Sequence, residues 1–431
     1  MTVPINRSVS KGMRNTEHLW SQQIIKIIET SCIENSDRVA CNTINRLLHR
    51  EGSDQALKLR TITDLCDRHG KEVEEYQEKA ARHTLQKNGF DPETGHLEEG
   101  TNLPVGVLLS SEAAGVFEDA DERVRNIIES INEKREGKEK IPENSQKPYN
   151  VELPDEAVVM VSLDGVLSKR QKEHRTKSGN HEDETVQKNT LSKKRPAVET
   201  SVAHIEVNEK RYILTAHDMR TLCIRVLAFL LDSGLLVNRQ LIIFSDGATE
   251  IKSSVDEIFS FCRHCIVLDW FHLKKRCYEI LSMTLKSGKS NREMRHTVMR
   301  NLLRILWVGN VEGACQYLAE LPSKWIKSGD KQQELISYLQ RKESIIACYA
   351  LRSRLGLRIS SNPVEKANDL TVSTRQKHQG MSWSSHGSWH FAALTALYLN
   401  HEEDSWHKSA SLSFKMVPVF RQKSGHSTAA A

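Results

Sequence analysis

Three short apolar runs, each followed by an aspartate, constrain this chain more than any other part of its sequence. Runs of this length with almost no polar residue are typical of strands that are buried on both faces of a sheet. The runs and their acids are 157–163 with Asp164, 241–244 with Asp246, and 266–268 with Asp269. Helical patterns over 219–236 and 249–261 separate these runs, and a further strand is expected over 205–214. The chain is therefore predicted to be an α/β protein with parallel neighbouring strands.

Aspartates at the ends of parallel strands collect at one edge of a sheet, where α/β proteins place their functional groups. If the first run lies beside the second, the carboxylates of Asp164 and Asp246 come close together. Two neighbouring carboxylates repel each other unless cations lie between them. A pair of Mg²⁺ or Mn²⁺ ions about 4 Å apart relieves that repulsion and suits the cleavage and transfer of phosphodiesters.

Each candidate acid also has a purely structural interpretation, and the sequence leaves these alternatives open. Asp164 and the glycine after it are compatible with a type I′ hairpin turn. Asp246 is compatible with a loop residue that caps the following helix. A third acid, Glu365, is compatible with a capping box that starts at Asn362, with Pro363 at the first helical position.

Five short motifs that contain these acids stand in a fixed order along the chain. They are Leu163-Asp164-Gly165, Ser245-Asp246-Gly247, Leu268-Asp269-Trp270-Phe271-His272, Ser361-Asn362-Pro363-Val364-Glu365 and Gly380-Met381-Ser382-Trp383-Ser384. The ordered set, which covers about 155–400, resembles the bacterial insertion-sequence transposases of the DDE type. The resemblance implies an RNase H-like fold, in which helices flank a mixed five-stranded sheet.

The same resemblance implies a catalytic and metal-binding triad. The family's first aspartate corresponds to Asp164, its second to Asp246, and its glutamate to Glu365, on a helix reached after a long helical insertion. Such an enzyme uses two Mg²⁺ or Mn²⁺ ions to cleave double-stranded DNA at transposon ends and to join the freed 3′ end to target DNA. It is expected to act as a homo-oligomer on DNA.

The element Asp269-x-x-His272 also resembles a signature of mutator-like transposases, where it is associated with DNA handling near the active site. The alternative for His272 is a helix start whose ring is satisfied by a core carbonyl. The candidates for contacts with the DNA backbone are His272 itself, Lys274, Lys275 and Arg276 after it, and Arg375 and Lys377 on a helix expected over 363–378. The last two cations have an alternative role, which is to complement the helix dipole. Trp383, like Asp269, is assigned a supporting role, and it either stacks on a base or covers the core.

Composition and periodicity divide the chain into six segments. They are a helical region that is a candidate for DNA binding (1–90), a connector with one helix near 117–134 (91–150), the first part of an RNase H-like catalytic core (151–272), a helical insertion (273–358), the last part of the core with the glutamate-bearing helix (359–400), and a tail (401–431). In the first segment, two helical patterns flank a break from Asp67 to Gly70. This outline fits a helix-turn-helix DNA reader, but acidic residues after the break favour an ordinary pair of helices.

Charge leaves a nucleic-acid partner open, and hydropathy argues against a membrane partner. Lys and Arg number 61 against 56 Asp and Glu in 431 residues, so any basic DNA-binding surface has to be local. No stretch approaches about 18 apolar residues, and nine cysteines without a repeated spacing are typical of reduced thiols. A cytoplasmic, nucleoid-associated bacterial protein is expected. For the close pair Cys262 and Cys265, buried thiols are favoured over a zinc site.

Two other functions compete with transposition. One is an RNase H-like nuclease that cuts without joining strands, and the other is a transposase-derived DNA-binding protein that has lost catalysis. The presence of an acid at all three triad positions argues against the second.

Overall fold

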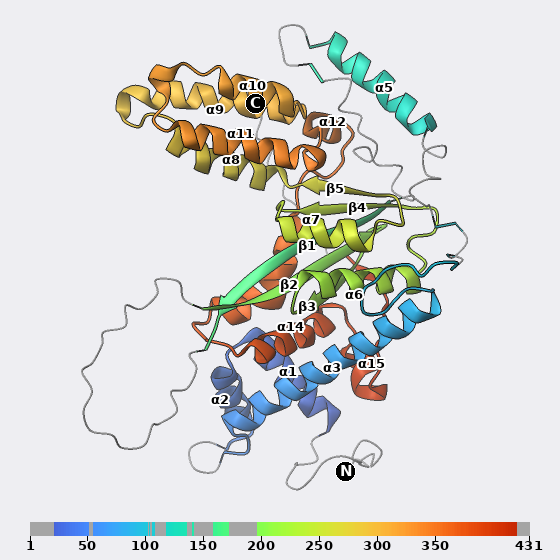
Figure 1. Cartoon of the computed structure of the whole chain (residues 1–431). Coiled ribbons are helices and arrows are strands. Elements are labelled where there is room, and N and C mark those ends of the chain that lie inside the picture. The colour runs from blue at the N-terminus through green and yellow to red at the C-terminus, as the bar shows by residue number, and fades with distance from the viewer. Residues whose placement is uncertain are drawn as a thin grey trace, which may run out of the picture.

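The computed structural model describes residues 21–50, 55–101, 103, 106–107, 118–135, 140–141, 158–171 and 196–419. These residues form a six-stranded mixed sheet with the strand order β5-β4-β1-β2-β3-β6 (Figure 1). The strands are β1 (Val158–Lys169), β2 (Ala197–Val207), β3 (Lys210–Ala216), β4 (Gln240–Ser245), β5 (His264–Leu268) and β6 (Val417–Pro418). Strands β1, β4 and β5 run parallel to one another, whereas β2, β3 and β6 continue the sheet in antiparallel pairs. The prediction of an α/β protein is confirmed.

Two sequence-based expectations about the strands are wrong. The single strand expected over 205–214 is a hairpin, because Asn208 and Glu209 adopt φ angles of 47° and 60° and form a tight turn between β2 and β3. Positive φ at both central residues is the geometry of the two-residue turns that join antiparallel strands. The strand expected to end at Asp164 continues to Lys169, so the interpretation of Asp164 as a turn residue is also wrong.

Helices cover both faces of the sheet, and the side chains of β2 alternate between two apolar clusters. Ala203 and Ile205 belong to the main core, which includes residues of α6 (Met219–Asp232) and α7 (Thr249–Ile258). Val202 belongs to a second cluster with residues of α13 (Asn362–Asn368), the π-helix η8 (Asp369–Lys377) and α14 (Ser385–Leu399). Because successive side chains of a strand point to opposite faces, the two groups of helices lie on opposite sides of the sheet.

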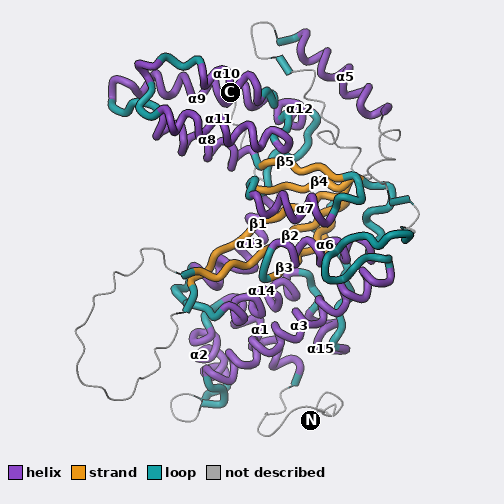
Figure 2. The backbone as a smooth tube through the Cα atoms, viewed as in Figure 1, coloured by secondary structure: helices purple, strands orange, loops and turns teal. Residues whose placement is uncertain are grey.

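The helix expected over 363–378 is interrupted in its hydrogen-bonding pattern. It begins as α13 and continues as η8, in which the wider π turn changes which residues face the core. Helix α13 lies against β1 and β2 (Figure 2).

The N-terminal helices pack on one another and on α6 and α14 rather than forming a helix-turn-helix. They are α1 (Gln22–Glu34), α2 (Asp37–Leu47) and α3 (Leu59–Lys87). Helix α3 is continuous over 29 residues, so both the helix-turn-helix and the helical pair with a turn at Gly70 are wrong. A Cβ atom at Gly70 would lie 2.1 Å from the backbone oxygen of His390 in α14. The glycine therefore permits a close crossing of two helices instead of breaking one.

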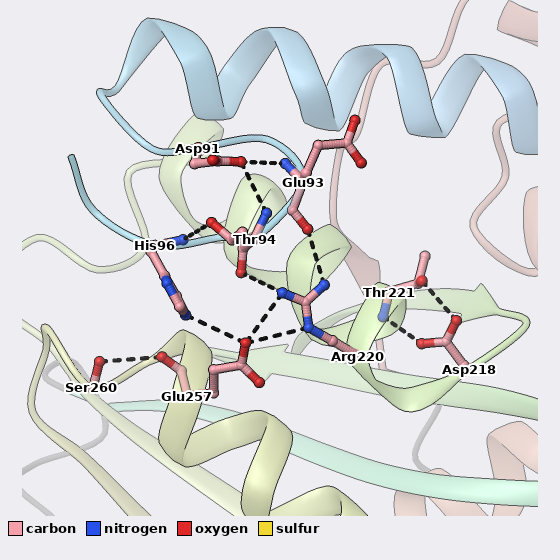
Figure 3. Close-up of polar contacts among 9 residues, drawn as sticks. All are labelled: Asp91, Glu93, Thr94, His96, Asp218, Arg220, Thr221, Glu257 and Ser260. Carbon is pink, nitrogen blue, oxygen red and sulfur yellow. Dashed lines mark hydrogen bonds and ion pairs between the residues drawn. The ribbon is translucent and has the colours of Figure 1, made fainter.

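Arg220 holds the segment after α3 against α6 and α7 (Figure 3). The guanidinium of Arg220 donates to the carbonyl oxygens of Glu93 and Thr94, at 2.9 and 3.1 Å, and to the carboxylate of Glu257. Further along the connector, α5 (Glu118–Glu133) confirms the helix expected near 117–134.

A group of helices lies beyond the β5 edge of the sheet (Figure 1). It contains α8 (Trp270–Thr284), α9 (Arg292–Trp307), α10 (Val311–Ala319), α11 (Gly329–Lys342) and α12 (Tyr349–Arg354), which occupy most of the segment 273–358. In the expected tail, α15 (Glu403–Ser409) precedes β6, which pairs with β3. Residues 1–20, 172–195 and 420–431, which belong to the expected helical region, catalytic core and tail, lie outside the described residues.

Within the described part of the chain, no helix is both long and apolar enough to cross a membrane. Cys262 and Cys265 are both buried, and burial raises the pKa of Cys262 to about 12.

Candidate active site

The two candidate aspartates fall in the same row of the sheet. Strands β1 and β4 pair from Val158 with Gln240 through Ser162 with Phe244, a constant offset of 82 residues (240 − 158). Asp164 and Asp246 have the same offset (246 − 164 = 82), two residues beyond the last pair. Parallel pairing in this register therefore brings the two aspartates side by side at the carboxyl end of β4.

Asp164 has an unusual electrostatic environment. Its pKa is raised to about 6, first because the carboxyl group is largely buried and next because the carboxylate of Asp246 repels its negative charge, with a smaller contribution from Glu365. A hydrogen bond from the N–H of Gly165 and the nearby His272 act in the opposite direction. The structure thus brings Asp164, Asp246, Glu365 and His272 into one electrostatic neighbourhood, although more than 200 residues of sequence separate the first from Glu365 (365 − 164 = 201).

Both carboxylate oxygens of Asp164 accept hydrogen bonds. Oδ1 accepts from the N–H of Gly165 at 2.8 Å, and Oδ2 accepts from Nδ2 of Asn368 at 2.6 Å. Asn368 is buried, and its Oδ1 atom has no hydrogen-bond partner among the described residues. Asn368 is not among the site residues predicted from the sequence. Its position three residues after Glu365, on the same side of a helix, was the available signal.

Asp246 and Gly247 form a tight turn between β4 and α7. Oδ1 of Asp246 accepts from the N–H of Ala248 at 2.7 Å, and Gly247 adopts a φ of +86°. A Cβ atom at Gly247 would lie 2.6 Å from Cδ1 of Leu268, so this position requires glycine for both its backbone angle and its space. Asp246 is only partly buried and remains accessible at the edge of the sheet.

Glu365 and His272 meet at the exposed side of the site. Nε2 of His272 lies 3.7 Å from Oε1 of Glu365, whose side chain is 48% exposed. Nδ1 of His272 is buried and has no hydrogen-bond partner among the described residues. The capping box expected from Asn362 is not formed, because Ser361 precedes α13 as its N-cap and makes no side-chain cap. Glu365 is therefore free of that structural task.

Asp269 serves a structural purpose. It is fully buried, and its Oδ1 accepts from the N–H of His272 at 2.8 Å, which caps the N-terminus of α8. Its Oδ2 accepts from the N–H and the hydroxyl of Ser361 at 2.5 and 3.0 Å. Asp269 therefore connects the end of β5 and the start of α8 to the segment that carries Glu365.

The donor atoms of the site fit hard divalent cations. Carboxylate oxygens and an amide oxygen are ligands that Mg²⁺ and Mn²⁺ accept, and the unpartnered Oδ1 of Asn368 lies on the residue that bonds to Asp164. Among the described residues, no three His, Cys, Asp or Glu side chains converge closely enough to ligate one ion together. The acids share a region of negative charge that His272 only partly offsets.

The predicted DNA-contacting cations have different environments. Arg375 is 1% exposed, and its guanidinium forms an ion pair with Asp37 at 2.5 Å and donates to the carbonyl oxygen of Cys32 at 2.8 Å. The prediction that Arg375 contacts DNA is therefore wrong, because a partner far away in sequence holds it inside the protein. Lys377, two residues later, is exposed.

The three cations of α8 are also unequal. Arg276 forms ion pairs with Glu279 and Glu334, whereas Lys275 is exposed and Lys274 lines a cavity. Arg276 is thus less available to a phosphate than its two neighbours.

Trp383 lies in the apolar core beneath Arg375. Its side chain is 8% exposed, and the guanidinium of Arg375 lies 5.2 Å from the centre of its ring. Of the two roles considered for this residue, the structure favours packing over base stacking.

No protein-family model, curated protein or solved structure matches this chain.

Proposed function

We propose that this chain is a DNA transposase with an RNase H-like catalytic core, which cleaves DNA at transposon ends and joins the freed end to target DNA. The observation that carries the proposal is that Asp164, Asp246 and Glu365 lie close enough to interact electrostatically at one edge of a mixed sheet. Burial raises the pKa of Asp164 most, and the negative charges of Asp246 and Glu365 raise it further. Perturbed carboxyl groups that converge from distant parts of a chain are typical of functional sites.

The strand arrangement supports the RNase H-like part of the proposal. An antiparallel series of β1, β2 and β3 adjoins the parallel strands β4 and β5, and helices cover both faces. This arrangement supports the mixed five-stranded sheet flanked by helices that the resemblance implies, and β6 adds a two-residue strand at the far edge. A fold supports many activities, so the functional proposal depends on the site rather than on the sheet.

Asp164, Asp246 and Glu365 are the residues that would hold two Mg²⁺ or Mn²⁺ ions. When bound, such ions supply an activated water and stabilise negative charge on the oxygens of a phosphodiester. The chain's own residues prepare the site. Asn368 orients the carboxylate of Asp164 through its amide, and His272 faces the carboxylate of Glu365. The buried Asp269 keeps both His272 and Glu365 at the edge of the sheet.

The test is a cleavage and joining assay with the full chain. A 3′-labelled duplex and a supercoiled plasmid are incubated with the protein and Mn²⁺, and both cut and joined products are measured. Asp164→Asn, Asp246→Asn and Glu365→Gln should each reduce product formation by at least about a thousandfold, while DNA affinity changes little. Glu199→Gln is the matched control, because Glu199 lies on the neighbouring strand β2 and packs near Gly165 rather than beside Asp246.

The products distinguish the competing functions. Cut DNA without joined product would favour a nuclease on the same site. DNA binding without any cleavage would favour a transposase-derived binding protein. Normal cleavage by Asp164→Asn would refute the site itself.

A further inference from the structure

A cavity of about 610 Å³ lies between α8 and α9, outside the acidic site. Its lining combines the cations Lys274, Arg300 and Arg304 with the aromatic rings of Trp270, Tyr278 and Trp307. A cavity of this size accommodates a ligand of several rings or a short segment of a polymer. We refer to it below as the α8–α9 groove.

Helical spacing aligns the groove residues on two facing stripes. On α8, Trp270, Lys274 and Tyr278 follow one another at intervals of four residues. On α9, the same interval relates His296, Arg300 and Arg304, and Trp307 follows one turn later. Residues at this interval lie on the same side of a helix, so each helix presents one continuous mixed stripe to the groove.

Three cations of the groove have no carboxylate partner in the part of the chain that the structure describes. Among the described residues, Lys274, Arg300 and Arg304 form no ion pair, and Arg300 and Arg304 are exposed. Arg276, on another side of α8, is by contrast paired with Glu279 and Glu334. The groove therefore holds a local excess of positive charge in a chain whose total net charge is only +5.

Aromatic rings form the other part of the lining. The rings of Trp270 and Trp307 meet edge to face with their centroids 4.9 Å apart, and Tyr349 supports both from behind, at 4.8 and 6.1 Å. The side chain of Tyr278 is 46% exposed. The tryptophans are held rigidly by packing, whereas Tyr278 offers an open ring surface to a ligand.

We propose that the α8–α9 groove binds a nucleotide, with its phosphates at Lys274, Arg300 and Arg304 and its base against Tyr278 and Trp307. Sites that bind single-stranded nucleic acid generally combine cations along the phosphate backbone with aromatic rings on which the bases stack. Helix α8 also joins the groove to the acids, because Trp270 directly follows Asp269 and His272 reaches Glu365. The assignment of this nucleotide to a DNA strand that continues toward the acids rests on the proposed function, whereas nucleotide binding itself does not.

Binding is measured by the fluorescence anisotropy of a labelled 20-nucleotide oligo(dT), with Asp164→Asn as the parent protein so that cleavage plays no part. The double variant Arg300→Ala/Arg304→Ala should weaken binding at least tenfold and lower the salt dependence by about 0.7 in log Kd per log salt for each cation removed. Lys289→Ala/Arg292→Ala is the charge-matched control, because both residues are exposed near the start of α9 and neither lines the groove. Equal weakening by both double variants, or by neither, would overturn the proposal.

Two further measurements test the role of the Tyr278 ring and the place on the chain where the oligonucleotide binds. Tyr278→Ala should weaken oligo(dT) binding about fivefold or more, and Tyr278→Phe should retain it. Photocrosslinking with 5-iododeoxyuridine should label peptides that contain 270–278 or 300–307. A crosslink confined to other parts of the chain would overturn the groove assignment.

Competition with free dTTP identifies the source of the nucleotide. If dTTP displaces oligo(dT) poorly, the groove binds a nucleotide that is part of a strand. If dTTP displaces oligo(dT) at a concentration similar to that of oligo(dT) itself, the groove binds a free nucleotide. Because all these readouts are of binding, the groove proposal survives a failure of the cleavage assay. It can also fail while cleavage by the unmodified protein persists.

Discussion

The carboxylate of Asp269 accepts two hydrogen bonds from Ser361, one from its backbone N–H at 2.5 Å and one from its hydroxyl at 3.0 Å. These bonds connect the end of the edge strand β5 with a segment 92 residues farther along the chain. Because Glu365 follows Ser361 by one helical turn, the pair determines where the third acid of the site lies. Asp269 therefore positions Glu365 for the proposed chemistry and is not itself a member of the triad.

Asp269→Ala should lower the free energy of unfolding by about 3 kcal/mol, since it removes a helix cap and leaves the buried donors of Ser361 without an acceptor. Urea denaturation measures this loss. In the cleavage assay, the variant should also require more Mn²⁺ for half-maximal rate, because Glu365 is no longer held in place. Ser361→Ala removes only the hydroxyl bond and should cost about 1 kcal/mol. An unchanged Mn²⁺ requirement in Asp269→Ala would contradict the positioning role.

The raised pKa of Asp164 predicts that this residue destabilises the fold at neutral pH. Its pKa of about 6 in the folded state exceeds the ordinary 3.8, so the folded form binds the proton more tightly. Its favourable contribution is complete below about pH 4 and is lost as the pH rises through about 6. Asp164→Asn should therefore unfold at a higher temperature than the unmodified protein at pH 7.5, by a stability difference of about 2 kcal/mol.

The difference between the two proteins should become small at pH 4, which thermal denaturation at both pH values can measure. Mn²⁺ at pH 7.5 should raise the melting temperature of the unmodified protein more than that of Asp164→Asn. A variant that is less stable than its parent at pH 7.5 would contradict the repulsion inferred between Asp164 and Asp246.

The pKa of Glu29 is shifted in the opposite direction from that of Asp164. Burial of this carboxylate raises its pKa, but hydrogen bonds with His407 and His69 outweigh burial and bring the pKa down to about 2. Tyr398 also donates to Oε2 at 2.6 Å. Because the folded pKa is depressed, the contribution of Glu29 is present above about pH 4.5 and is lost as the pH falls toward 2.

Glu29→Gln should lower the free energy of unfolding by about 3 kcal/mol at pH 7, since it leaves the surrounding donors without their charged acceptor. Chemical denaturation at pH 7 and pH 3 provides the comparison. The penalty should shrink at the lower pH, where the unmodified protein has also lost part of this contribution. A penalty independent of pH would show that packing, rather than charge, determines it.

Gly70→Ala should destabilise the protein even though Gly70 lies within a helix. Alanine normally stabilises a helix interior by up to about 1 kcal/mol relative to glycine. Here the new Cβ would lie 2.1 Å from the backbone oxygen of His390, so helices α3 and α14 would have to separate, at a cost of about 2 kcal/mol or more.

Gly329→Ala is the control for this substitution, because Gly329 lies in the first turn of α11 and a Cβ there meets nothing within 4 Å. It should be neutral or slightly stabilising. A stabilising effect of Gly70→Ala in thermal denaturation would refute the close crossing.

The sequence by itself determined the parts of this protein that depend on neighbouring residues. The apolar runs before Asp246 and Asp269 predict β4 and β5 correctly, because burial on both faces demands continuous apolar side chains. The same runs place the aspartates at strand ends, and the strand register then follows from the pattern of burial. Asp164 was identified as a candidate for this reason, although its strand continues beyond it.

Only the tertiary structure decided the roles that depend on distant partners. Arg375 was expected at a DNA surface, but Asp37 and the rings of Trp383 and Phe391 hold it in the interior. Gly70 was predicted to break a helix, but it lies within a continuous helix and leaves room for the backbone of His390. Local sequence contains the propensity of each segment. It does not contain the identity of the group that packs against a side chain from hundreds of residues away, and that group decides whether a cation faces solvent or the core.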